Sequence, residues 1–124
     1  MTATGITTYL WFDVQALEAA TFYVDLFPDS KLGSISYYQA DAQRPEGSVL
    51  TVEFEIFGQR FAALNGGPQF PHSEAVSFQV SCETQADVDR YWDALTADGG
   101  AESQCGWCKD KWGISWQIIP VALD

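Results

Sequence analysis

The order of the expected elements repeats once along this chain of 124 residues. Each half begins with an apolar strand and a helix, and short alternating strands follow. Between the halves lies the stretch Asn65–Ser73, NGGPQFPHS, whose two glycines and two prolines make it the one credible internal linker. We therefore expect a single α+β domain over 1–124, built from two βαβββ modules at about 1–65 and about 74–124.

The first half predicts one helix among four strands. Its opening segment, ITTYLWF, is rich in the β-branched and aromatic residues typical of strands. The spacing then becomes helical and stops before Pro28, because proline cannot continue a helix. The expected elements are a strand at Ile6–Phe12, a helix at about Val14–Phe27, and strands at about Leu32–Gln39, Ser48–Phe57 and Gln59–Leu64.

The second half repeats this order. EAVSFQVSC predicts a strand over Glu74–Cys82, and a helix is expected from about Gln85 to Ala97. Thr84 is a suitable N-cap for that helix, with Asp87 three residues later as a variant of the capping box. The remaining residues predict short strands that end at Pro120.

The composition predicts a packed globular protein and disfavours negatively charged partners. Hydrophobic residues make up 47% of the chain, and the formal net charge is −11. Such a charge repels phosphate backbones and anionic lipids, so neither nucleic acid nor a membrane surface is expected as a partner. No apolar run approaches the ~20 residues of a membrane span. The start, MTATGITTYLWFD, has no basic region or cleavage pattern, so we expect a cytoplasmic protein.

The segment CGWCKDKWGISWQIIP contains two cysteines at CxxC spacing, which raises the question of a redox or metal motif. In an extended chain, residues three apart point to opposite faces, so Cys105 and Cys108 are not expected to meet. We expect both to be free thiols, with Cys108 acting as a small core residue. Asp110 is expected to accept backbone N–H groups in the turn that follows.

Four stretches resemble the PhnB-like family, often labelled 3-demethylubiquinone-9 3-methyltransferase, of the vicinal oxygen chelate superfamily. They are FYVDLFPDSKL at 22–32, LNGGPQF at 64–70, VDRYWDALTADGG at 88–100 and QCGWCKDKWGISWQIIP at 104–120. This superfamily includes glyoxalase I, extradiol dioxygenases and bleomycin-resistance proteins. The resemblance implies a curved mixed sheet that forms a concave cup, helices on the convex side, and a homodimer.

The resemblance also implies where a metal would bind. The superfamily's metal enzymes take one ligand from the first and last strand of each module, which corresponds here to Thr8, Asn65, Ser77 and Gln117, with Ala63 and Ala75 as neighbouring choices. These residues are poor ligands for a divalent metal, so we expect no metal and no other cofactor. Methyl transfer is not expected either, because no strand leads into a glycine-rich cofactor loop.

Strand alternation predicts which side chains line the cup. If Val76, Phe78 and Val80 pack on helices, and Trp116 and Ile118 do so on the last strand, the intervening residues face the concavity. On the first strand, Thr8, Leu10 and Phe12 are expected to share the inward orientation. The expected ligand-binding residues are Thr8, Leu10, Asn65, Ser77, Gln79, Cys105, Trp107, Ser115 and Gln117. No catalytic residue can be assigned, and His72 is expected to be a loop residue without a chemical role.

Three functions are compatible with this set. The first is a homodimer that binds a small organic ligand without a metal, because hydroxyl and amide groups among apolar residues suit such a site. The second is a metal-assisted enzyme with a rearranged site that uses Gln117, Asn65, His72 or a cysteine. The third is a structural or regulatory dimer whose cup has lost its function.

Overall fold

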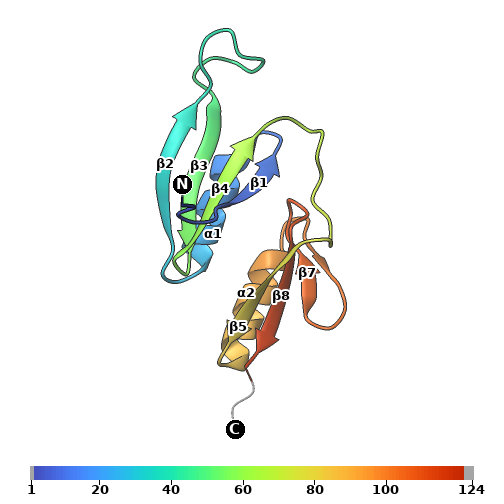
Figure 1. Ribbon diagram of the computed structural model, residues 1–124. Coiled ribbons are helices and arrows are strands. Elements are labelled where there is room, and N and C mark those ends of the chain that lie inside the picture. Colours follow the sequence, from blue (N-terminus) through green and yellow to red (C-terminus); the bar gives the residue numbers. More distant parts are fainter. Residues whose placement is uncertain (1, 122–124) are drawn as a thin grey trace. The chain divides into compact units, whose positions relative to one another are not determined.

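The computed structural model describes residues 2–121, and Met1 and residues 122–124, the outer ends expected for the two modules, lie outside that range. The chain divides into two compact units between Phe70 and Pro71. Their elements, shown in Figure 1, are β1 (Thr8–Phe12), α1 (Ala16–Leu26), β2 (Lys31–Tyr37), β3 (Val49–Ile56), β4 (Gln59–Asn65), β5 (Ser77–Cys82), α2 (Gln85–Thr96), β6 (Ala101–Glu102), β7 (Trp107–Lys109) and β8 (Ser115–Pro120). The predicted α+β class with two βαβββ modules is confirmed.

In the first unit, α1 packs against one face of a four-stranded sheet with the order β1-β4-β3-β2. β1 runs parallel to β4, and the other pairs are antiparallel. Tyr23 of α1 is buried and stacks on Phe54 of β3, with 6.2 Å between the ring centroids. This contact identifies the face of the sheet that the helix covers. Phe61, the cross-strand neighbour of Phe54, lies on the same face.

The orientation predicted for the first strand is wrong. Leu10 and Phe12 are buried, whereas Tyr9 is 61% exposed. Leu10 lies opposite Ala63, which in turn lies opposite Val52, and that row belongs to the helix-covered face. By alternation, Thr8 lies on the same face. The segment TYLWF is apolar on both faces, so its own sequence gave no sign of which side chains the helix would cover.

The first helix is slightly shorter than expected, and its end has a local cause. Phe27 has extended dihedral angles, φ −99° and ψ 139°, and it directly precedes Pro28. The ring of a proline disfavours the helical region for the residue before it, so the helix ends at Leu26.

The second unit repeats the arrangement with the strand order β5-β8-β7-β6. β5 runs parallel to β8, and α2 packs against the sheet through the buried residues Tyr91 and Leu95. The predicted N-cap is confirmed, because the Thr84 hydroxyl accepts a hydrogen bond from the Asp87 backbone N–H at 3.1 Å. The first strand of this unit was expected from Glu74 but begins at Ser77. Val76, which was expected to pack on the helix, therefore precedes the strand and is 64% exposed.

Neither helix within residues 2–121 has the length and apolar character needed to cross a membrane.

Candidate functional site

The open face of the second sheet, opposite the face that α2 covers, gathers most of the predicted ligand-binding residues. Two cross-strand rows on β5, β8 and β7 supply them (Figure 1). The members of these rows, in strand order, are Ser77, Ser115 and Lys109 in one, and Gln79, Gln117 and Trp107 in the other. Their alternates Val80, Cys108, Trp116 and Ile118 are buried on the helix-covered side. This open face, defined by the two rows, is the candidate site.

A side-chain hydrogen bond joins the two rows. The Nε2 group of Gln117 donates to the Oγ atom of Ser77 at 2.8 Å. Gln117 is half-buried, so the bond holds its amide against the sheet. The Ser77 hydroxyl acts as acceptor here and retains its own hydrogen for donation to a second partner.

Ser115 is the most deeply buried polar residue of the open face, at 1% exposure. Its Oγ atom has no hydrogen-bond partner among the described residues. A buried hydroxyl without a partner costs free energy, so such groups are rare and each calls for an explanation. In register, Ser115 lies between Ser77 of β5 and Lys109 of β7.

Asp110 fixes the start of the strand that carries Ser115 and Gln117. Its Oδ1 atom accepts the backbone N–H groups of Trp112 and Ile114, each at 3.0 Å. Its Oδ2 atom accepts the indole N–H of Trp116 at 2.9 Å. Asp110 is buried, so these donors replace the water that its carboxylate has lost. The predicted role of this residue in the turn is confirmed.

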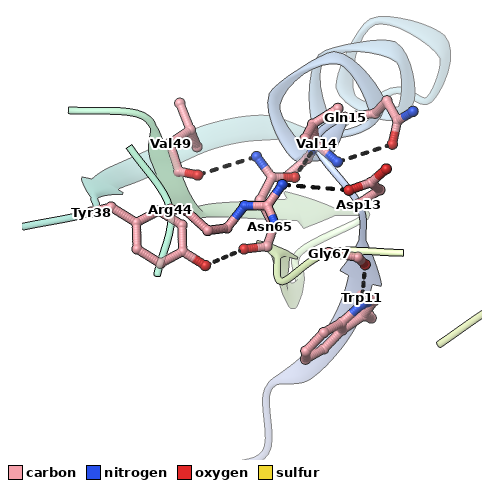
Figure 2. Close-up of polar contacts among 10 residues, drawn as sticks. Trp11, Asp13, Val14, Gln15, Tyr38, Arg44, Val49, Asn65 and Gly67 are labelled. Carbon is pink, nitrogen blue, oxygen red and sulfur yellow. Dashed lines mark hydrogen bonds and ion pairs between the residues drawn. The ribbon is translucent and has the colours of Figure 1, made fainter. Parts of the chain in front are cut away.

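Asn65 was expected in the ligand site, but its side chain is used to hold α1. Its Oδ1 atom accepts the backbone N–H of Ala16 at 2.8 Å, and its Nδ2 group donates to the Val49 carbonyl at 3.2 Å. Gln15, the N-cap residue of α1, makes no side-chain cap bond, so Asn65 satisfies a free N–H at that helix end. Figure 2 shows the amide between Val49 and the helix, with the Tyr38 hydroxyl on the Asn65 carbonyl. Asn65 therefore lies on the helix-covered face.

Further contacts order the first part of the expected linker and the residues around it. The Trp11 indole N–H donates to the Gly67 carbonyl at 2.8 Å (Figure 2). Arg44 forms an ion pair with Asp13 at 3.5 Å. Gly67 has φ +103°, a conformation that favours glycine. The segment that follows β4 is thus an ordered turn of the first unit.

The positions at which the resemblance implies metal ligands do not form a fitting set here. Asn65 is committed to α1, and Thr8 lies on the helix-covered face of its sheet. Ser77 and Gln117 are neutral and hydrogen-bonded to each other. Within residues 2–121, no cluster of three or more His, Cys, Asp or Glu side chains could hold an ion. A divalent first-row metal prefers imidazole, carboxylate or thiolate ligands, which these positions do not supply.

The CxxC cysteines occupy different environments. Both are free thiols, as is Cys82, and this prediction is confirmed. Cys108 lies on the helix-covered face opposite Trp116. Burial raises the pKa of its thiol to about 11, and the nearby charges of Asp110 and Glu102 add to the effect. Cys105 is exposed in the turn before β7 with φ 56°, so it does not belong to the rows of the open face.

A groove of about 480 Å³ on the first unit was not predicted from the sequence. Charged groups dominate its rim: Lys31 and Glu55 form an ion pair at 3.6 Å, and Arg60 lies opposite Glu55 in register. Only the cross-strand register brings these charges together, and the sequence alone did not give that register. The candidate site is placed on the second unit instead, because most of the predicted ligand-binding residues share one face there.

Comparisons with known proteins agree with this fold. A family model described as 3-demethylubiquinone-9 3-methyltransferase matches residues 4–119. A solved structure described as a putative 3-demethylubiquinone-9 3-methyltransferase, PhnB protein, from Bacillus cereus is 33% identical, with a TM-score of 0.85, covering 95% of this chain and 100% of that chain. A protein from Pseudomonas aeruginosa is 18% identical, with a TM-score of 0.73, over 95% of this chain and 98% of that chain.

More distant likeness extends to a metal-containing structure. A variant of the fosfomycin resistance protein FosX from Listeria monocytogenes, in complex with Mn(II) and 1S,2S-dihydroxypropylphosphonic acid, is 17% identical with a TM-score of 0.61, over 98% of this chain and 96% of that chain. At this identity the likeness concerns the fold alone. No protein with a curated description matches the chain.

Proposed function

Since the chain belongs to the 3-demethylubiquinone-9 3-methyltransferase family, the PhnB-like group of the vicinal oxygen chelate superfamily, we propose that it binds a small organic molecule without a catalytic metal. The proposed site is the open face of the second sheet. One observation carries the proposal: Ser77, Gln79, Ser115, Gln117 and Trp107 share that face, and the buried Ser115 hydroxyl has no partner among the described residues.

The chemistry of these groups supports a ligand with both polar and flat apolar parts. Gln117 and Gln79 each offer an amide oxygen and an amide N–H group, and the two serines offer hydroxyls. Trp107 is half-buried and presents an indole next to Gln117. A few fixed polar groups beside an aromatic surface are typical of sites that orient a small molecule.

Methyl transfer is not part of the proposal, despite the family's name. The usual fold for a nucleotide-like cofactor is a doubly wound parallel sheet with a glycine-rich turn after its first strand. Each sheet of this chain has one parallel pair of strands and is otherwise antiparallel. The turn after β1 reads Asp13-Val14-Gln15, without glycine.

A ligand panel tests the proposal directly. Purified protein without a histidine tag would be screened by thermal shift against metabolites and antibiotics, and hits would be compared between wild type, Gln117→Ala and the control Gln59→Ala. Gln59 is an exposed glutamine of the first unit. We expect hits whose stabilisation is lost in Gln117→Ala and kept in Gln59→Ala. Stoichiometric Zn, Ni, Fe or Mn in the purified protein would favour the metal-assisted enzyme instead.

We also propose that the protein is a homodimer, as the family resemblance implies. Size-exclusion chromatography with light scattering measures the mass in solution, and the chain itself has a mass of 13.7 kDa. A mass of one chain across the accessible concentration range would contradict this part of the proposal.

A further inference from the structure

An ion pair crosses the start of β8 on the open face. Lys109 of β7 contacts Glu74 with 2.8 Å between Nζ and Oε1. Glu74 precedes β5 by three residues, and β8 lies between β5 and β7 in the sheet. A side-chain bond between these two residues therefore spans β8. The same segment passes close to the turn before β8, because a Cβ atom on Gly113 would lie 3.9 Å from His72.

Further hydrogen-bond donors lie in the same cross-strand row as Lys109. Ser115 is buried between Lys109 and Ser77 in register, and its hydroxyl has no partner among the described residues. The Ser77 oxygen accepts from Gln117, which leaves its hydrogen free to donate. An ammonium group and two hydroxyls thus lie along one row of the open face. The group that the ammonium contacts is the Glu74 carboxylate, which comes from the chain itself.

We propose that this row is a carboxylate-binding subsite, in which Glu74 is an internal occupant that a carboxylate of the ligand displaces. The inference rests on the proposed function, since it names the ligand class of the same site. A carboxylate accepts hydrogen bonds from an ammonium and from hydroxyls at once, and such charge-assisted bonds are the strong ones. The Glu74 side chain is 64% exposed, so it can move into water when a ligand takes its place.

The charges favour a carboxylate over other ionic ligands. A cation would meet the Lys109 ammonium, and the hydroxyls are neutral. A doubly charged phosphate would be opposed by the net charge of −11, whereas one carboxylate is neutralised by one lysine. Trp107 lies in the next row, so an aromatic or apolar body attached to the carboxylate has a surface to cover.

Benzoate and benzamide are matched probes, because they differ in charge and share the ring. Their dissociation constants would be measured by ¹⁵N NMR titration, with the side-chain amides of Gln79 and Gln117 and the Trp107 indole N–H as reporters. The test variants are Glu74→Gln, Lys109→Met and Ser115→Ala. The controls are Glu83→Gln and Lys111→Met, which make the same changes of charge at exposed positions of the same unit.

We expect benzoate to bind wild type more tightly than benzamide does. Because Glu74 forms a surface ion pair, Glu74→Gln should tighten benzoate binding by roughly twofold to fivefold and leave benzamide unchanged. Lys109→Met should remove the preference for benzoate, and Ser115→Ala should weaken benzoate binding by about threefold to tenfold. Glu83→Gln and Lys111→Met should match wild type.

Three outcomes would overturn the inference: equal binding of the two probes, no gain in Glu74→Gln, or no response of the open-face signals to either probe. Binding of benzamide without a preference for benzoate would leave the proposed function standing. The amide spectrum of each variant reports whether it is folded, and Glu74→Gln alone provides the test if Lys109→Met does not fold.

Discussion

Gln117 of β8 donates its amide N–H to the Ser77 hydroxyl of β5 at 2.8 Å, which joins residues 40 positions apart on the open face of the second sheet. Among the described residues, these are the only two on that face that occupy positions where the superfamily's metal enzymes place a metal ligand. Both groups are neutral, whereas a divalent first-row metal prefers imidazole, carboxylate or thiolate ligands. The two groups do form a fixed polar element against which a small ligand can be oriented.

Loss of the Asp110 carboxylate should destabilise the second unit strongly. Asp110→Ala leaves the N–H groups of Trp112, Ile114 and Trp116 without their acceptor in a buried turn. We expect a loss of about 3–5 kcal/mol in the free energy of unfolding. Urea denaturation measures it, with Asp93→Ala on the exposed side of α2 as the control. A loss below about 1 kcal/mol, the range of an exposed pair, would contradict this account.

Asn65→Ala should weaken the start of α1 without affecting the ligand site. The variant loses the bonds to the Ala16 N–H and the Val49 carbonyl, which we expect to cost about 1–3 kcal/mol of stability. Hydrogen exchange at Ala16 should accelerate, and ligands that contact Gln117 should bind as they do to wild type. Loss of ligand binding in a folded Asn65→Ala protein would show that Asn65 has a role in the site after all.

The Glu74–Lys109 pair predicts a pH effect on stability. The hydrogen bond and the charge of Lys109 lower the pKa of Glu74 from its ordinary value of 4.5. A carboxyl whose pKa is lowered by folding stabilises the folded state above its unfolded pKa, and this contribution is lost as the pH falls through the folded pKa. The difference in unfolding free energy between wild type and Lys109→Met should therefore be constant above about pH 5.5 and shrink toward pH 3.

A direct titration checks the cause of that effect. In a ¹³C NMR titration, the pKa of Glu74 should return toward 4.5 in Lys109→Met. The control Lys111→Met removes a neighbouring charge and should leave the pKa of Glu74 lowered. An unchanged Glu74 titration in Lys109→Met would show that the ion pair does not persist in solution.

The thiols should differ in reactivity. Cys105 is exposed, whereas Cys82 and Cys108 are buried. Burial also raises the pKa of Cys108 to about 11, so its reactive thiolate form is scarce at neutral pH. At pH 7.5, an aromatic disulfide reagent should label Cys105 rapidly and the other two cysteines only on unfolding. Rapid labelling of Cys108, or a disulfide between Cys105 and Cys108 in the native protein, would contradict the assignment of Cys108 to the core.

The sequence predicted the orientation of some strands and not of others, for a physical reason. In β8, apolar Trp116 and Ile118 alternate with polar Ser115 and Gln117, so burial of one set determines the face of the other. In β1, TYLWF is apolar at every position except its first, and only the pairing of Leu10 with Ala63 shows which face the helix covers.

The roles of single residues depended on how far away their partners lie. Asp110 was predicted correctly because its backbone partners are within four residues of it. The bond of Asn65 to the start of α1 was not predicted, because its partner, Ala16, is 49 positions away and becomes a neighbour only through the pairing of β1 with β4. The ion pair of Glu74 with Lys109 was not predicted for the same reason, since it requires β8 to lie between β5 and β7.

The central claim is that the open face of the second sheet binds a small organic molecule without a metal. The most direct measurement is the ¹⁵N NMR spectrum of metal-free protein titrated with the best hit of the thermal-shift panel. We predict saturable shifts of the Gln79 and Gln117 side-chain amides and the Trp107 indole N–H, which are lost in Gln117→Ala and kept in Gln59→Ala. Saturable shifts confined to the first unit, or shifts that appear only when a divalent metal is added, would contradict the claim.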